Sequence, residues 1–135
     1  MRIKSLLRVL VMSVVALVLF AAPVVAASWG PIKSYYNGSE VVRSWGDATI
    51  EDFDGVNDFY LKDSKNDGNA VYAKTRFVDF FYPFYYSTKT SAEYENITKH
   101  LTHSRGAVGR MLTLACAQMG WPVPDSCTSW TDIAP

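Results

Sequence analysis

Short strand-forming segments separated by tight-turn signals are the feature that most limits how this chain can fold. Turn signals occur at three places, namely Asn37-Gly38, Asp54-Gly55 and Asn66-Asp67-Gly68-Asn69. Asn-Gly and Asp-Gly pairs supply the positive φ angles that tight hairpin turns require. The segments between these signals are rich in Val, Thr, Tyr, Phe and Trp, which favour strands. Strands spaced by about 8–12 residues with polar turns are typical of an antiparallel sandwich or barrel.

Alternating side chains within these segments indicate a sheet that is buried on one face. Four residues of the segment 71–77 would share one face, namely Val71, Ala73, Thr75 and Phe77. The segment 58–62 likewise places Phe59 and Leu61 on one face and Tyr60 on the other. Successive side chains of a strand point to opposite faces, so this period of two predicts a half-buried sheet. The sequence therefore predicts an all-β fold, a small antiparallel β-sandwich or barrel.

One region fits two local structures. Tyr94, Ile97 and Leu101 recur at helical spacing, which favours a short amphipathic helix near 90–101. The same segment is short enough to form a strand. A helix near 90–101 therefore stays open within an otherwise all-β chain.

Two cysteines, Cys116 and Cys127, are the only ones in the chain. They would lie in the two arms of a final hairpin, 112–118 and 126–130, joined by the proline-containing segment 120–125. An even number of cysteines in a small exported chain predicts a disulfide, and a loop of this size would stabilise by roughly 3 kcal/mol through chain entropy. No CxxC pair or further ligand stands at a metal-binding spacing, so we expect no metal and no cofactor.

The segment 1–27 has the composition of a secretory signal peptide. Basic residues occupy three of the first eight positions, an apolar run follows at 9–22, and small residues come after it. This order is typical of a cleaved leader, and the apolar run is shorter than the roughly 20 residues that a membrane-spanning helix needs. We expect cleavage after Ala26 or Ala27, which leaves one secreted, extracellular β-rich domain at 28–135.

The charge of the mature domain excludes two classes of partner. The leader holds three of the 13 basic residues and none of the 13 acids, so the mature domain would carry a net charge near −3. Such a domain lacks the basic surface that nucleic acids require. It also lacks the polybasic patch that anionic lipids attract. We therefore expect neither a nucleic acid nor a membrane as its partner.

The search for catalytic motifs is mostly negative. The chain has no GxSxG, HExxH or P-loop motif, and its only histidines, His100 and His103, lack a fixed third metal ligand. A Ser-His-Asp triad or a pair of carboxylates needs no short motif, so these two chemistries stay open. Seven acids lie between 47 and 67. We interpret them as turn residues, although calcium binding by these loops stays open.

Seven aromatic rings lie in the segment 77–86. A two-layer sandwich buries one face of each sheet, so a regular strand here would leave rings in water. Pro83 ends ladder pairing, and we therefore expect Phe77 and Phe81 to be buried and the later rings to be partly exposed. Exposed aromatic surface usually marks binding, so the candidate binding residues are Tyr82, Phe84, Tyr85 and Tyr86. The alternative, that all of the rings cap a small core, stays open.

Three stretches resemble, in their layout, the small secreted proteins of actinobacteria. These stretches are SWGPIKSYY, the expected hairpin LKDSKNDGNAVYAKTRF at 61–77, and LACAQMGWPVPDSC. The resemblance implies export, a β-sandwich and one C-terminal disulfide, and it implies no activity. We expect a secreted, non-catalytic module that binds an extracellular protein, a glycan or the cell envelope. The alternative is a small secreted hydrolase or a toxin-like effector with a dispersed site.

Overall fold

Every element of the described structure is a β-strand. The computed structural model describes residues 24–65, 67–79, 85–92 and 98–135, of which 85–92 as backbone alone. Nine strands occur within these ranges: β1 (Val25–Tyr36), β2 (Ser39–Glu51), β3 (Asp54–Asp63), β4 (Val71–Asp79), β5 (Tyr85–Ala92), β6 (Thr98–Arg105), β7 (Val108–Ala117), β8 (Ser126–Cys127) and β9 (Thr131–Ala134). The predicted all-β class is confirmed.

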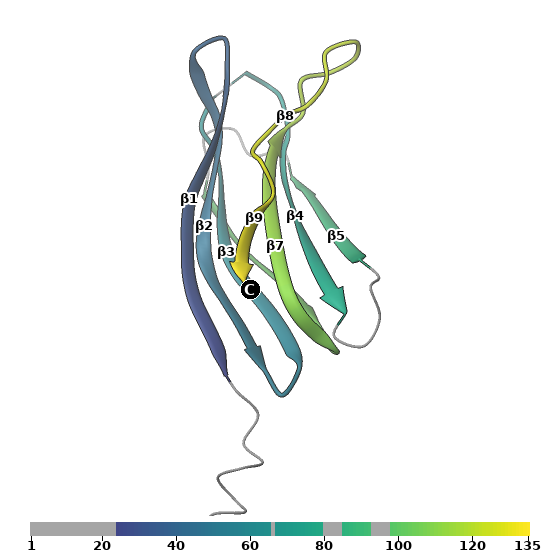
Figure 1. Ribbon diagram of the computed structural model, residues 1–135. Coiled ribbons are helices and arrows are strands. Elements are labelled where there is room, and N and C mark those ends of the chain that lie inside the picture. The colour runs from purple at the N-terminus through teal and green to yellow at the C-terminus, as the bar shows by residue number, and fades with distance from the viewer. Residues whose placement is uncertain (1–23, 66, 80–84, 93–97) are drawn as a thin grey trace, which may run out of the picture.

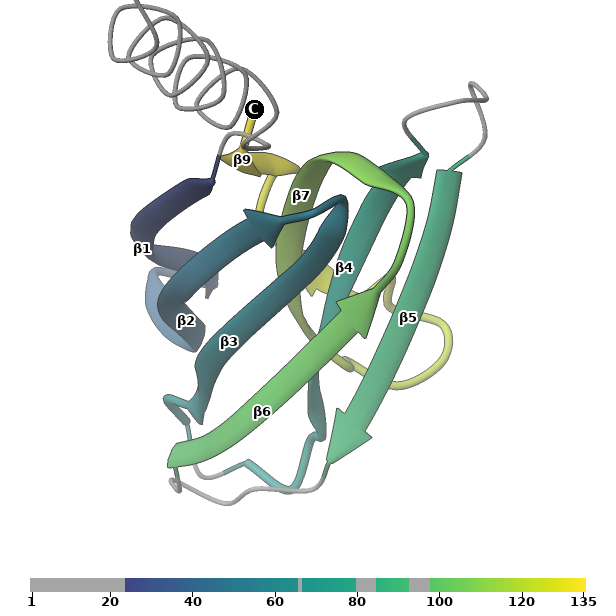
Figure 2. The same cartoon turned by 90° about the horizontal axis from the view of Figure 1, so that it is seen from below.

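Two antiparallel sheets pack face to face (Figure 1). The first sheet has the strand order β1-β2-β3-β6, and the second has the order β5-β4-β7-β8, with β9 also paired to β7. The chain changes sheet between β3 and β4, between β5 and β6, and between β6 and β7. Figure 2 shows the last of these changes, where β6 runs through a bend into β7 in the other layer. The fold is therefore the predicted sandwich.

The first predicted turn is a two-residue hairpin. Asn37 and Gly38 have φ angles of 49° and 79°. They join β1 to β2, with Tyr36 paired to Ser39. Positive φ at both central residues matches the twist of the flanking strands. The hairpin prediction at this position is confirmed.

The second turn lies two residues before the predicted one. Asp52 and Phe53, with φ angles of 48° and 65°, join β2 to β3, whereas Asp54 and Gly55 begin β3. The prediction of a turn at Asp54-Gly55 is therefore wrong. Gly55 lies close to the second sheet, because a Cβ there would come within 3.0 Å of the Met111 sulfur.

The third turn signal connects the two sheets instead of two paired strands. Gly68 has a φ angle of 73°, as the signal predicts. However, β3 belongs to the first sheet and β4 to the second. The segment 61–77 is therefore not a hairpin, which corrects the sequence-based expectation. A turn signal predicts that the chain reverses its direction. It does not predict which strand the next segment pairs with, because that pairing depends on how the side chains pack.

The core lies between the sheets and follows the predicted alternation. Phe59 and Leu61 are fully buried, whereas Tyr60 between them is 41% exposed. The predicted inner face of β4 is buried throughout: Val71, Ala73, Thr75 and Phe77. The core position of Phe77 is confirmed, and Phe81 lies outside the described residues.

The chain covers the outer face of the second sheet with its own C-terminal segment. Tyr72 is buried although it points away from the core, because it packs against Leu114, Cys116 and Trp130. Its hydroxyl donates to Asp125 Oδ2 at 2.6 Å. Desolvation and this carboxylate raise the pKa of Tyr72 to about 12. The guanidinium of Arg76 lies 4.1 Å from the centre of the Trp130 ring.

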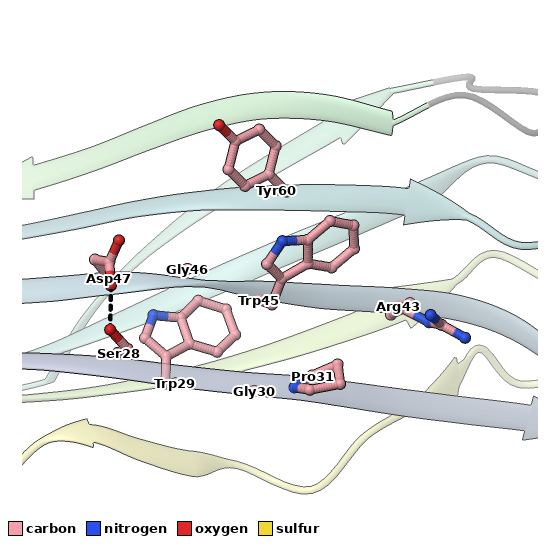
Figure 3. Close-up of a pocket in the computed structure, with 9 residues that line it drawn as sticks. All are labelled: Ser28, Trp29, Gly30, Pro31, Arg43, Trp45, Gly46, Asp47 and Tyr60. Atoms are coloured by element: carbon pink, nitrogen blue, oxygen red, sulfur yellow. Dashed lines mark hydrogen bonds between the residues drawn. The ribbon is translucent and has the colours of Figure 1, made fainter.

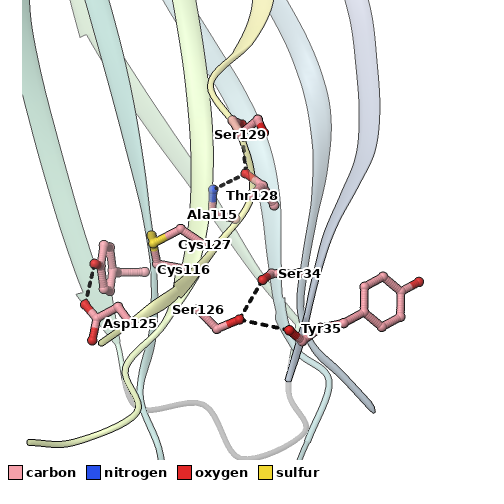
Figure 4. The surroundings of a disulfide bond; sticks show 10 residues. Ser34, Tyr35, Ala115, Cys116, Asp125, Ser126, Cys127, Thr128 and Ser129 are labelled. Carbon is pink, nitrogen blue, oxygen red and sulfur yellow. Dashed lines mark hydrogen bonds between the residues drawn. A yellow bond between two sulfur atoms is a disulfide. The ribbon is translucent and has the colours of Figure 1, made fainter. Parts of the chain in front are cut away.

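The predicted disulfide between Cys116 and Cys127 is formed (Figure 4). The two residues are directly paired between β7 and β8, with Cα atoms 4.1 Å apart. The final hairpin is thus confirmed, although β7 begins before the predicted arm and the returning chain pairs with β7 again as β9. Ser126 also joins the two sheets, because its hydroxyl lies 2.8 Å from the Ser34 hydroxyl and donates to the Tyr35 carbonyl at 3.1 Å.

The helix left open near 90–101 is not formed by the described residues. Residues 90–92 belong to β5 and residues 98–101 to β6, so the helical alternative is wrong for them. Tyr94 and Ile97 lie outside the described residues. Leu101 packs against the core from β6, as strand alternation also allows. Sheet pairing thus decides a short segment whose local pattern fits both structures.

The predicted leader lies mostly outside the described residues. β1 begins at Val25, so cleavage after Ala26 or Ala27 would remove the first two or three residues of this strand. The signal peptide and a mature domain that starts near 28 stay predictions. No helix in the described ranges is long and apolar enough to cross a membrane.

Candidate ligand-binding site

The outer face of the first sheet carries three rows of side chains that run across its strands. Strand register places residues of neighbouring strands directly opposite each other. The aromatic row contains Pro31, Trp45, Tyr60 and His100; the acidic row contains Ser28, Asp47, Asp58 and Thr102; and the basic row contains Lys33, Arg43 and Lys62. Because side chains alternate along a strand, all of these residues point away from the core.

The aromatic row is a continuous stack across three strands. The ring centroids of Trp45 and Tyr60 are 5.6 Å apart, with planes 18° apart. Tyr60 and His100 are 4.8 Å and 24° apart. Offset, near-parallel rings at roughly 4.5–7 Å attract each other. The side chain of His100 is 52% exposed, so the stack is open to a ligand.

A bulge in β1 completes the aromatic row. The pairing of β1 with β2 shifts between Trp29 and Ile32, so Gly30 and Pro31 lie beside Trp45. Gly30 has a φ angle of 86°, and a Cβ there would come within 2.8 Å of a carbonyl oxygen of β2. Only glycine fits this bulge without strain. Figure 3 shows Pro31 and Trp45 on the neighbouring strands that result.

A groove of about 490 Å³ opens at the bulge. Its lining combines the three rows, with Pro31, Trp45 and Tyr60 from the aromatic row, Ser28 and Asp47 from the acidic row, and Arg43 from the basic row. Figure 3 shows the Ser28–Asp47 pair at one end of the groove and Arg43 at the other. The volume is within the roughly 300–1,000 Å³ of small-molecule sites.

Two carboxylates lie directly opposite each other in the acidic row. Asp47 on β2 is paired with Asp58 on β3, and like charges in this arrangement destabilise a sheet. Ser28 donates to Asp47 Oδ1 at 2.6 Å. Thr102 donates to Asp58 Oδ1 at 2.7 Å, and His100 Nε2 lies 2.7 Å from the same oxygen. Within the described part of the chain, neither Oδ2 atom accepts a hydrogen bond, so two acceptors remain for a ligand.

Glu40 holds the basic row in place and neutralises part of its charge. Arg43 donates from Nε and Nη2 to the two oxygens of Glu40 at 2.8 and 2.9 Å. Lys33 Nζ lies 3.6 Å from the same carboxylate. The hydrogen bond from Arg43 is the main reason why the pKa of Glu40 is lowered to about 2, and Glu40 in turn raises the pKa of Arg43. With Lys62 included, the row keeps a net positive charge.

Two buried rings support the site from below. The ring centroids of Trp29 and Phe59 are 6.3 Å apart, although a strand separates β1 from β3. They meet because Gly46, which is paired with both residues, has no side chain. A Cβ at Gly46 would come within 2.7 Å of the Phe59 Cβ.

A chain of buried hydrogen bonds leads from the groove through the core. Trp29 Nε1 donates to Asn57 Oδ1 at 3.0 Å, and Asn57 Nδ2 donates to Thr75 Oγ1 at 2.9 Å. Thr75 Oγ1 lies 2.7 Å from His103 Nδ1. Burial lowers the pKa of His103 below its ordinary value, so the ring is neutral near pH 7. The chain joins β1, β3, β4 and β6, and it fixes the groove wall to both sheets.

The predicted binding residues lie on the other sheet or outside the described ranges. Tyr82 and Phe84 are outside these ranges. Tyr85 and Tyr86 belong to β5, where their backbones pair with Val78 and Phe77 at the edge of the second sheet. A binding role for these rings stays a prediction.

Sequence reasoning missed the aromatic row because its members come from separate segments. Trp45, Tyr60 and His100 are 15 and 40 residues apart and meet only through strand register. A partial signal existed, since the alternation around Phe59 and Leu61 already places Tyr60 on the outer face. The alternation predicts that Tyr60 points outward, but it does not predict which side chains of the neighbouring strands lie beside it.

The described residues assemble no catalytic triad. The groove contains Ser28 and Asp47 but no histidine. His100 contacts Asp58, and His103 is buried in the core. No group of three metal-ligating side chains comes together in the described part of the chain. The groove residues present aromatic rings, charged groups and a hydroxyl group.

Comparisons with family models, with curated proteins and with solved structures found no match to this chain.

Proposed function

We propose that this protein is a secreted, non-catalytic binding module whose ligand site is the groove beside Trp45. One observation carries the proposal, namely that the stacked aromatic row borders a groove on the outer face of the first sheet. Exposed aromatic surface usually marks a binding site, because its burial releases water. Charged and hydroxyl groups at both ends of the groove would orient a ligand.

Two features support an extracellular location. The disulfide between Cys116 and Cys127 is of a kind that persists in oxidising compartments and is rare in the cytosol. The predicted leader at 1–27 would direct export. Amino-terminal sequencing of protein from culture supernatant tests this part, with Ala27 or Ser28 as the expected first residue. An intact leader on the recovered protein would contradict it.

Co-sedimentation with isolated cell envelopes of the producing organism tests the binding site. The informative variant is Trp45→Ala/Tyr60→Ala, which removes two rings of the aromatic row. The matched control is Trp121→Ala, because this ring is 96% exposed and lies outside the groove. We expect the wild type and the control to sediment with envelopes and the groove variant to stay in the supernatant. Equal sedimentation of a correctly folded groove variant would exclude this site.

A glycoside hydrolase is the second candidate, because Asp47 and Asp58 are paired across two strands. Retaining glycosidases use two carboxyl groups about 5–5.5 Å apart. The release of new reducing ends from a bound glycan, abolished by Asp47→Asn and by Asp58→Asn, would favour this function. Binding without such release favours the module.

A further inference from the structure

We propose that the groove binds an uncharged glycan, whose sugar rings lie across the strands along the aromatic row. This inference rests on the proposed binding function and adds the class of the ligand and its direction. Three observations carry it: the stack of rings, the row of acceptors on one side of the stack, and the row of donors on the other.

The aromatic row matches the apolar face of a sugar ring. A pyranose presents C–H bonds on its faces, and their partial positive charge is attracted to the negative face of an aromatic ring. Trp45 offers the largest ring of the row, and Pro31 on the neighbouring strand adds a second apolar surface (Figure 3). A sugar in this groove would therefore lose water from its apolar faces.

The two flanking rows match the hydroxyl groups at the edges of the same sugar ring. A hydroxyl both donates and accepts hydrogen bonds. On one side, Asp47 and Asp58 each present an Oδ2 atom that accepts no hydrogen bond within the described part of the chain. On the other side, Arg43 and Lys62 present N–H donors. A ligand with hydroxyls along both edges satisfies both rows at once.

Other polymers would satisfy only part of the site. A polyanion would be repelled by Asp47 and Asp58 and by the net negative charge of the mature domain. A proline-rich peptide would stack on the rings, but its carbonyl groups only accept hydrogen bonds and would leave the Oδ2 atoms of Asp47 and Asp58 without donors. A cationic peptide would pair with the acidic row but be repelled by Arg43 and Lys62. An uncharged glycan fits all three rows.

The geometry of the row also predicts the direction and the length of the ligand. The aromatic row crosses β1, β2, β3 and β6 at right angles to the strands. Three strand spacings of about 4.8 Å extend over roughly 14 Å, which is longer than a single sugar ring. Affinity should therefore rise with the number of sugar units until the row is covered.

Affinity gel electrophoresis of the mature protein tests the ligand class. Gels that contain hydroxyethylcellulose, arabinoxylan, galactomannan or a soluble β-1,3-glucan supply uncharged glycans, and polygalacturonate supplies a charged one. Decaproline and oligolysine are titrated separately by tryptophan fluorescence. We expect retardation by at least one uncharged glycan, a loss of tenfold or more in affinity for Trp45→Ala, and a several-fold loss for Asp47→Asn. The Trp121→Ala control should bind as the wild type does.

The outcomes separate the ligand class from the binding function. Binding of decaproline, of oligolysine or of polygalacturonate alone, lost in Trp45→Ala, would overturn the uncharged glycan but keep the binding site. Retardation that is equal in Trp45→Ala and the wild type would place the glycan elsewhere and overturn the inference. The absence of retardation by every uncharged glycan would also overturn it. The envelope experiment then decides independently whether the groove binds a component of the cell envelope.

Discussion

Trp45 and Tyr60 stack across β2 and β3 with ring centroids 5.6 Å apart, on a sheet face that remains open to solvent. Aromatic pairs in such a geometry contribute about 0.5–1.5 kcal/mol beyond the burial of their area. We therefore expect a coupling free energy of this size in a double-mutant cycle with Trp45→Ala and Tyr60→Ala, measured by urea unfolding. The same cycle with Trp45 and Tyr35 is the control and should give no coupling. Equal values in the two cycles would contradict a specific stack.

Gly46→Ala should destabilise the protein, because its Cβ would come within 2.3 Å of the Asp58 carbonyl oxygen. Backbone atoms cannot move aside as a flexible side chain does, and overpacking of this kind costs roughly 1–3 kcal/mol or more. The matched control is Gly106→Ala, whose Cβ would meet only the side-chain end of Asp54 at 3.1 Å. Thermal unfolding compares the two variants. Similar melting temperatures would show that β2 and β3 can separate at Gly46 without cost.

Removal of the disulfide should lower the free energy of unfolding by roughly 2–5 kcal/mol, as for native bridges in small secreted domains. The variant is Cys116→Ser/Cys127→Ser, which leaves no unpaired thiol, and urea unfolding is the measurement. The loss of the bridge also frees the segment that covers Tyr72. Titration of free thiols in the native protein should find none, and a positive result would contradict the pairing.

His103 should make stability depend on pH. Burial lowers its pKa in the folded protein from the ordinary 6.5, so the unfolded chain takes up a proton at a higher pH than the folded chain does. The free energy of unfolding is therefore constant with respect to this group above about pH 6.5 and falls as the pH drops below that value. Urea unfolding from about pH 8 to about pH 5 measures the slope.

The control for this slope is His103→Gln, which removes the titrating group and should flatten the curve. Glu40 does not interfere, because its pKa is lowered from 4.5 to about 2 and its contribution is lost only as the pH falls through this lower range. Identical slopes for the variant and the wild type would exclude His103 as the cause.

Phe77→Ala should cost about 3–5 kcal/mol, because Phe77 is 1% exposed in the core. Tyr85→Ala and Tyr86→Ala should leave the melting temperature nearly unchanged if these rings are the partly exposed residues that the sequence predicts. Thermal unfolding of the three variants checks both statements. If the tyrosine variants unfold as readily as Phe77→Ala, the whole aromatic run belongs to the core.

Local signals in the sequence were sufficient for the fold class, for the hairpin at Asn37-Gly38 and for the final hairpin. Asn37-Gly38 has the residues that positive φ angles favour, and the alternation around Phe59 and Phe77 correctly identifies the inward side chains of β3 and β4, although Tyr72 on the outer face of β4 is also buried. The turn at Asp52 and Phe53 could not be predicted in this way, because a phenylalanine with a positive φ angle is imposed by the surrounding sheet. Gly55, which resembles a turn residue, instead lies where the two sheets come close.

The misplaced turn is one reason why the candidate site could not be predicted, beside the bulge in β1 and the pairing of β3 with β6. A hairpin turn at Asp54-Gly55 would pair Trp45 with Ser64, whereas the turn two residues earlier pairs it with Tyr60. A shift of two residues at a turn moves the register of the strands by four, and each row of the site depends on that register. Pairs of residues on neighbouring strands can therefore be assigned only when the position of the turn is known, and here that position is set by the packing of the sheets.

The two outer faces of the sandwich differ, because Trp130 and its neighbours cover part of the second sheet, whereas the outer face of the first sheet carries the three rows. A sandwich of two sheets has two outer faces, and here the chain uses its own C-terminal segment to cover β4 and β7 while the three rows stay open on the opposite side. A molecule attached to a polymer through the outer face of its first sheet would expose the disulfide and the C-terminal segment to the medium. In the part of the chain that the structure describes, the three rows lie on one outer face alone, so attachment through them would be one-sided.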